Sequence, residues 1–137
     1  MASPKHDGSI QRAYMRQQFP HFSVCWKCGR YLFAGTLQPT EASPIYRVKI
    51  HYALNEHPKV FVVEPDIAPN APHRYKDQSL CLFHPKNFTW TNSCLISKYT
   101  IPWTAAWLRF YEIWQKTGKW FADEEPHNTQ TSLDKAA

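Results

Sequence analysis

The clearest feature of the chain is an alternation of large apolar side chains with polar or small ones from Tyr46 to Leu54. This period of two predicts a β-strand with one buried face and one wet face. Asn55–Pro58 supplies a turn, and the apolar run within Lys59–Glu64 predicts the returning strand. Together with a preceding strand over Arg30–Leu37, the pattern predicts an antiparallel meander of at least three strands.

Two helices flank this meander. Ser9 is a candidate N-cap for a short helix that runs to about Gln18, where Pro20 ends it. We expect its buried face to consist of Ile10, Ala13 and Tyr14.

The second predicted helix has the strongest apolar face in the protein. Thr100 is a candidate cap with Pro102 in the first turn, and Gly118 ends the helix. Glu112 and Lys116 are predicted to form an i,i+4 pair on its outer face. The large side chains follow one another mostly at steps of three or four residues, as expected of a face in the core: Trp103, Trp107, Phe110, Tyr111 and Trp114.

Because strands and helices are segregated along the chain, the predicted fold class is α+β. A length of 137 residues suits one domain, which we expect over residues 1–127, with a flexible tail over 128–137. No run of 18 apolar residues and no secretory signal is present, which predicts a cytoplasmic protein outside the membrane. In that compartment the four cysteines are expected to be thiols or metal ligands.

Cys81 is the candidate nucleophile. Taken alone, Leu80-Cys81-Leu82-Phe83 favours a buried, inert cysteine in an apolar strand. Its surroundings favour reactivity, because a proline-rich loop precedes it and because basic side chains favour the thiolate, the nucleophilic form of the group. That loop carries the titratable or basic residues His73, Arg74, Lys76 and Asp77.

Many short motifs, in a fixed order, resemble the prokaryotic ubiquitin-conjugating-type enzymes encoded in antiphage cyclic-oligonucleotide signalling (CBASS) operons. The resemblance covers about residues 30–127. It is carried by Gly35-Thr36-Leu37-Gln38-Pro39-Thr40, the strand Tyr46–Tyr52, Pro58-Lys59-Val60-Phe61-Val62, His73, Leu80-Cys81-Leu82, Trp90, Thr100-Ile101-Pro102-Trp103, Trp107-Leu108, Tyr111-Glu112, Trp114, Thr117-Gly118-Lys119-Trp120 and His127.

This resemblance implies a ubiquitin-conjugating-like fold with a helix, a four-stranded meander and a C-terminal helical part. It also implies that Cys81 accepts an acyl group as a thioester and transfers it to an amine. The acyl group would be the C-terminus of a cGAS-like nucleotidyltransferase or another modifier protein, delivered by a ubiquitin-activating-type enzyme. No cofactor or metal is implied.

The resemblance leaves the residues around the cysteine open. The eukaryotic enzymes carry His-Pro-Asn before the cysteine, with the Asn linked to oxyanion stabilisation, whereas His73 is followed here by Arg74 and Tyr75. A backbone N–H or the Tyr75 hydroxyl could fill that role. We expect His73 to hold the loop more than to move protons, and Asp77 to orient or deprotonate the attacking amine or to be a solvated turn residue.

Two other functions compete with this one. A non-catalytic adaptor would keep the fold with Cys81 in the core. A small zinc-supported nucleic-acid-binding module would use Cys25 and Cys28 with the net charge of +5. We disfavour the zinc module, because one Cys-x-x-Cys pair lacks a matching second pair and because the basic residues are scattered singly.

Overall fold

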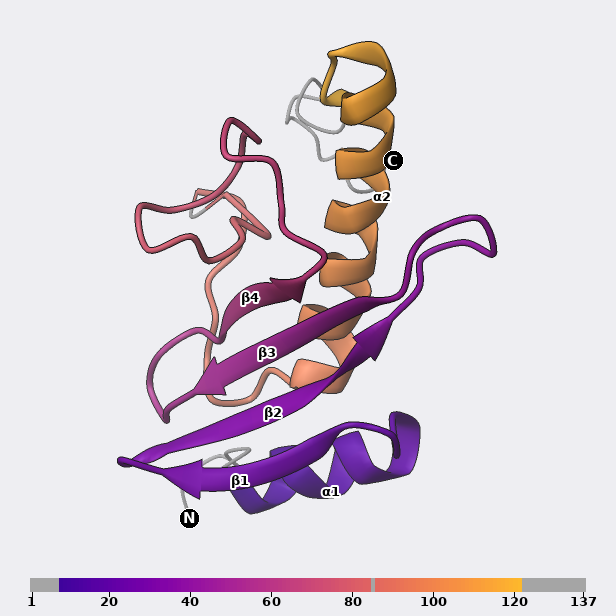
Figure 1. Cartoon of the computed structure of the whole chain (residues 1–137). Helices are drawn as coiled ribbons and strands as arrows, with labels where there is room; N and C mark the ends of the chain where they lie inside the picture. The colour runs from indigo at the N-terminus through magenta and orange to yellow at the C-terminus, as the bar shows by residue number, and fades with distance from the viewer. Residues whose placement is uncertain (1–7, 85, 122–137) are drawn as a thin grey trace.

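The computed structural model describes residues 8–84 and 86–121, and the predicted tail over 128–137 lies outside them. Within the described part of the chain, no helix is long and apolar enough to cross a membrane. A helix, four strands and a C-terminal helical segment follow one another (Figure 1), so the predicted α+β class is confirmed. The elements are α1 (Gly8–Gln18), β1 (Ser23–Lys27), β2 (Arg30–Leu37), β3 (Tyr46–Tyr52), β4 (Lys59–Glu64), the π-helical turn η1 (Ile96–Thr100) and α2 (Ile101–Thr117).

The strands form one antiparallel sheet in the order β1-β2-β3-β4. The bounds of β2 and β4 are those predicted from the sequence, and β3 ends at Tyr52, two residues before the alternation does. The sequence pattern missed β1 because most of its side chains are exposed, so it shows no apolar alternation. Cys28 and Gly29 form its two-residue connection to β2, with φ of 52° and 77°. Positive φ at both positions is what a tight hairpin turn of this length requires.

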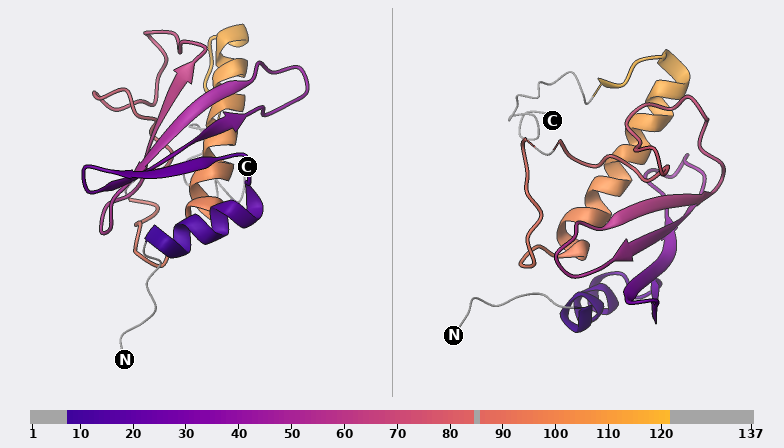
Figure 2. Two further views of the ribbon diagram at one scale, coloured as in Figure 1. Left: turned by 60° about the horizontal axis from the view of Figure 1, so that its bottom comes forward. Right: turned by 90° about the vertical axis from the view of Figure 1, so that its left-hand side faces the viewer.

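Helix α2 covers one face of the sheet, while α1 lies at the β1 edge near the start of α2 (Figures 1 and 2). The core between the layers joins strand residues such as Val48 and Ile50 with helix residues such as Trp107 and Leu108. This arrangement leaves β4 as the sheet edge next to the long loop that carries Cys81.

The prediction of which side chains of α1 are buried is wrong. Its buried residues are Gly8, Gln11 and Met15, whereas Tyr14 is exposed. The Gln11 amide is inaccessible to solvent; it donates to the Cys94 carbonyl at 2.8 Å and accepts from the Ile96 N–H at 2.9 Å. The helix therefore docks through a buried polar side chain, which an apolar periodicity cannot detect.

The start of α2 also differs from the prediction. Thr100 has helical dihedrals and makes no capping hydrogen bond, because the chain enters α2 through η1 and not from an extended segment. Its carbonyl instead accepts from the Thr104 hydroxyl at 2.7 Å. The predicted end is confirmed: Gly118 has φ of 80° and donates to the Trp114 carbonyl at 2.7 Å.

The aromatic face of α2 is confirmed at Trp107 and Tyr111, which are buried. Glu112 does not lie on the outer face as predicted. Its carboxylate accepts from the Ser43 hydroxyl at 2.9 Å and from the Tyr46 hydroxyl at 2.8 Å, and so ties the β2–β3 loop to the helix. Burial, and then the hydrogen bond and charge of Glu112, raise the pKa of Tyr46 well above its usual value.

We therefore predict that Glu112→Ala lowers the free energy of unfolding by about 2–3 kcal/mol, because it leaves the buried Tyr46 hydroxyl without an acceptor. Chemical denaturation measures this loss. Lys116→Ala, one turn further along on an exposed position, is the matched control and should change little. Equal effects of the two substitutions would contradict the role of Glu112 as the acceptor for Tyr46.

Candidate functional site

Cys81 follows a small hairpin in the loop between β4 and η1. Tyr75 and Ser79 are joined by a backbone hydrogen bond of 2.9 Å, and Arg74 pairs with Leu80 in an isolated antiparallel bridge. Gln78 closes the turn with φ of 77°. The Arg74 guanidinium donates back to the Ala68 carbonyl at 3.0 Å, which ties the hairpin to the preceding proline-rich loop.

This hairpin is attached to the edge of the sheet. The Leu80 N–H donates to the carbonyl of Val60 in β4 at 2.9 Å. The Leu80 side chain is buried in the core, whereas the next side chain, Cys81, is half-buried. Because side chains alternate along an extended segment, anchoring Leu80 inward turns Cys81 toward the surface.

The backbone of His73 holds the same segment from the other side. Its carbonyl accepts from the Cys81 N–H at 2.9 Å and from the indole Nε1–H of Trp107 in α2 at 3.0 Å. His73 has φ of 61°, in the left-handed region. Its ring packs against Trp120, with centroids 5.0 Å apart. The structure therefore brings His73 to the Cys81 segment through a main-chain carbonyl.

The Cys81 thiol lies between Tyr75 and Phe83. It donates to the Phe83 carbonyl, with Sγ 3.6 Å from the oxygen. Partial burial, followed by a side-chain hydrogen bond with Cys81, the charge of Cys81 and the charge of Asp77, raises the pKa of Tyr75 to about 12. Its phenol therefore stays protonated at neutral pH and can donate a hydrogen bond beside the sulfur.

His57 is a residue of this site that the sequence analysis missed. Its ring lies 6.4 Å from that of Tyr75 and 5.7 Å from that of Phe83, measured between centroids. From the sequence, Asn55–Pro58 is predicted only as the turn between β3 and β4. Pairing between β4 and the Cys81 segment brings this turn beside Tyr75 and Phe83, which lie on either side of Cys81 in the chain.

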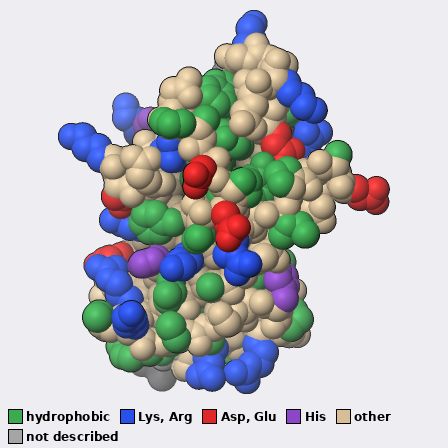
Figure 3. Space-filling model, viewed as in Figure 1, with side chains coloured by type: hydrophobic (Ala, Val, Ile, Leu, Met, Phe, Trp, Pro, Cys, Tyr) green, Lys and Arg blue, Asp and Glu red, His purple; other side chains and the backbone are tan. Residues whose placement is uncertain are grey.

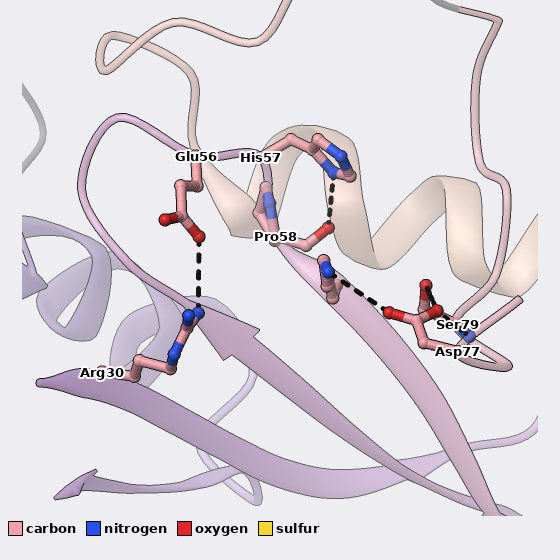
Figure 4. Close-up of polar contacts among 7 residues, drawn as sticks. Arg30, Glu56, His57, Pro58, Asp77 and Ser79 are labelled. Atoms are coloured by element: carbon pink, nitrogen blue, oxygen red, sulfur yellow. Dashed lines mark hydrogen bonds and ion pairs between the residues drawn. The ribbon is translucent and has the colours of Figure 1, made fainter. Parts of the chain in front are cut away.

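Asp77 belongs to the hairpin turn. One carboxylate oxygen accepts from the Ser79 hydroxyl at 2.6 Å and the Ser79 N–H at 2.9 Å, and the other lies 3.2 Å from Lys59 Nζ (Figure 4). The bonds from Ser79, followed by the Lys59 contact, lower the pKa of Asp77 to about 2. A carboxylate with so low a pKa is a weak base, so its contacts favour a part in shaping the turn.

The other cysteines lie elsewhere. Cys25 and Cys28 are exposed on the β1–β2 hairpin, and Cys94 is half-buried beside Thr91, whose N–H lies 3.5 Å from its Sγ. Among the described residues, no group of three or more His, Cys, Asp or Glu side chains could hold a metal ion. On the face seen in Figure 3, Lys and Arg side chains are spread among acidic ones and do not gather into one patch.

Compared with known protein families, residues 11–128 match the family described as Type II CBASS E2 protein. No curated protein matches the chain.

The low pKa of Asp77 predicts an acid-dependent stability. A carboxyl whose folded pKa lies below its ordinary value of 3.8 stabilises the fold above that pH, and the contribution is lost as pH falls toward about 2. We expect Asp77→Asn to lower the melting temperature at pH 7, and the difference from wild type to shrink between about pH 4 and pH 2. Glu56→Gln, which removes the similarly exposed ion pair with Arg30, controls for loss of charge. A difference that did not change with pH would contradict this account.

Proposed function

The chain belongs to the family of type II CBASS E2 proteins, and from that premise we propose that it is an acyl carrier whose Cys81 holds a thioester. It would pass the acyl group to an amine, as ubiquitin-conjugating enzymes do. Residues 1–127 would form one conjugating-type domain working in the cytoplasm.

The observation that carries this proposal is the setting of the Cys81 thiol. It is half-buried, its backbone is fixed by hydrogen bonds to neighbouring segments, and the protonated hydroxyl of Tyr75 lies beside it. An inert core cysteine needs no such donor. A thiol that becomes acylated does, because negative charge develops on the acyl oxygen as the tetrahedral intermediate forms.

The proposed chemistry has two steps. In the first, the Cys81 thiolate attacks the carbonyl carbon of an activated acyl group, an oxyanion forms, and the activating group leaves with its bonding electrons. In the second, an amine attacks the thioester, the C–S bond breaks, the thiolate returns to Cys81 and the amine nitrogen loses a proton. We assign the Tyr75 hydroxyl as a donor to the oxyanion in both steps.

We assign positioning roles to His73 and Asp77. The His73 carbonyl fixes the Cys81 N–H against α2, and Asp77 fixes the turn that carries Tyr75. Acyl transfer is sensitive to such positioning, because small displacements of the reacting groups cost rate.

Membership of this family implies interaction with other CBASS proteins. We propose that the acyl donor is the C-terminus of a cGAS-like nucleotidyltransferase, activated by a ubiquitin-activating-type enzyme, and that the transfer regulates antiphage signalling. No cofactor takes part in this scheme.

We predict that the protein, incubated with the nucleotidyltransferase, the activating enzyme and ATP, gains an adduct that thiols release. Cys81→Ser should trap a slower-forming oxyester that resists thiols. Cys81→Ala should gain none, whereas Cys25→Ser/Cys28→Ser, which removes the exposed hairpin thiols, should behave as wild type. Denaturing electrophoresis and peptide mass mapping measure the adduct. Its persistence on Cys81→Ala would refute the assignment.

We also predict that Tyr75→Phe slows both acylation and discharge of Cys81, by a factor on the order of 100, which is typical for loss of one oxyanion donor. Single-turnover rates from a preformed thioester measure the discharge. Tyr99→Phe, on η1 and against Trp103, is the matched control. Unchanged rates in Tyr75→Phe would exclude the hydroxyl from the chemistry.

A further inference from the structure

We propose that His57 is the base that takes the proton from the attacking amine when the Cys81 thioester is discharged. This inference rests on the proposed function, and it adds a residue that neither the sequence pattern nor the family match identifies.

His57 lies close to the two residues that flank the Cys81 sulfur. The sulfur donates to the Phe83 carbonyl, with Sγ 3.6 Å from the oxygen, and lies beside the Tyr75 side chain, with which it shares a hydrogen bond. The His57 ring packs against both of their rings, tilted by 41° to Tyr75 and nearly perpendicular, at 79°, to Phe83. The imidazole thus contacts two residues that also contact the thiol. It is half-buried, so an amine arriving from solvent can reach it.

The hydrogen bond at Nδ1 determines which nitrogen of the His57 ring can accept a proton. His57 Nδ1 lies 3.1 Å from the carbonyl oxygen of the buried Pro58 (Figure 4). A carbonyl oxygen can only accept, so Nδ1 carries the proton in this contact. In the neutral ring, Nε2 then keeps its lone pair and is available as the acceptor.

The ionisable groups near His57 and Cys81 have other roles. The Asp77 carboxylate accepts two hydrogen bonds from Ser79 and pairs with Lys59, and its pKa of about 2 makes it a weak base. The Tyr75 phenol is a donor, since its pKa is raised to about 12. The His73 ring packs against Trp120, and its carbonyl accepts from the Cys81 N–H.

The amine, the Cys81 thioester and His57 account for every bond and proton in this step. The amine nitrogen attacks the thioester carbonyl carbon and forms a C–N bond, which leaves the nitrogen positively charged. His57 Nε2 accepts one proton from that nitrogen, the C–S bond breaks, and its electron pair returns to Cys81 as thiolate. The products are an amide, a free Cys81 and a protonated His57, which returns its proton to solvent.

The test exploits a difference between nucleophiles. An amine must lose a proton after it attacks, whereas a thiolate attacks already deprotonated and needs no base. Full-length protein with Cys25→Ser/Cys28→Ser is acylated on Cys81 by exchange with a glycine-terminated peptide thioester. Discharge is then followed by mass spectrometry with lysine as the amine and with mercaptoethanesulfonate as the thiol.

We expect His57→Gln to slow discharge to lysine by a factor on the order of 100, as loss of a general base does, and to leave discharge to the thiol within about twofold of wild type. In His57→Ala, added imidazole should restore the reaction with lysine. His51→Gln is the matched control, because His51 also packs edge-to-face on a phenylalanine, Phe61, but lies on β3.

The proposal would be overturned by equal slowing of both nucleophiles, which marks a structural role, or by unchanged discharge to lysine. Failure of imidazole to rescue a folded His57→Ala protein, judged by its melting temperature, would do the same. If wild-type Cys81 is not acylated at all, the proposed function itself fails, and that result is separate because it precedes discharge.

Discussion

One carbonyl oxygen, that of His73, organises the site. It accepts from the backbone N–H of Cys81 and from the indole of Trp107, and so joins the cysteine segment to the helix that covers the sheet. With the bond from Leu80 to Val60 on the opposite side, the segment is fixed between β4 and α2. A loop with few regular hydrogen bonds of its own thereby presents a thiol in a defined place, which acyl transfer requires.

Strand β3 could be predicted from the sequence because it has one buried and one wet face, and β4 could be predicted from its apolar run. The pattern fails where docking is polar or exposed. Strand β1 has too little buried surface to show alternation, α1 is held by the buried amide of Gln11, and Glu112 faces the β2–β3 loop. In each case the geometry is set by a hydrogen bond or a strand pairing between residues far apart in the sequence. The periodicity of apolar residues does not reveal such contacts.

In the site, too, the residues marked by their local sequence could be predicted, and those placed by long-range contacts could not. Cys81 could be singled out because its neighbours in the chain are informative, and Tyr75 was already one of two candidates for the donor beside it. His57 could not, because it meets the site only through the pairing of β4 with the Cys81 segment. For Asp77 the sequence allows either a role toward the amine or a place in a turn, and its low pKa depends on Ser79 and on Lys59, which lies on β4.

The left-handed backbone at His73 has a consequence for how related proteins are recognised. What the fold requires at this position is a residue that tolerates φ of 61° and offers its carbonyl, and asparagine and glycine meet that requirement at least as well as histidine. Evolution can therefore exchange the imidazole while keeping the anchor. A motif search that demands histidine before the cysteine would pass over homologues that keep the same architecture.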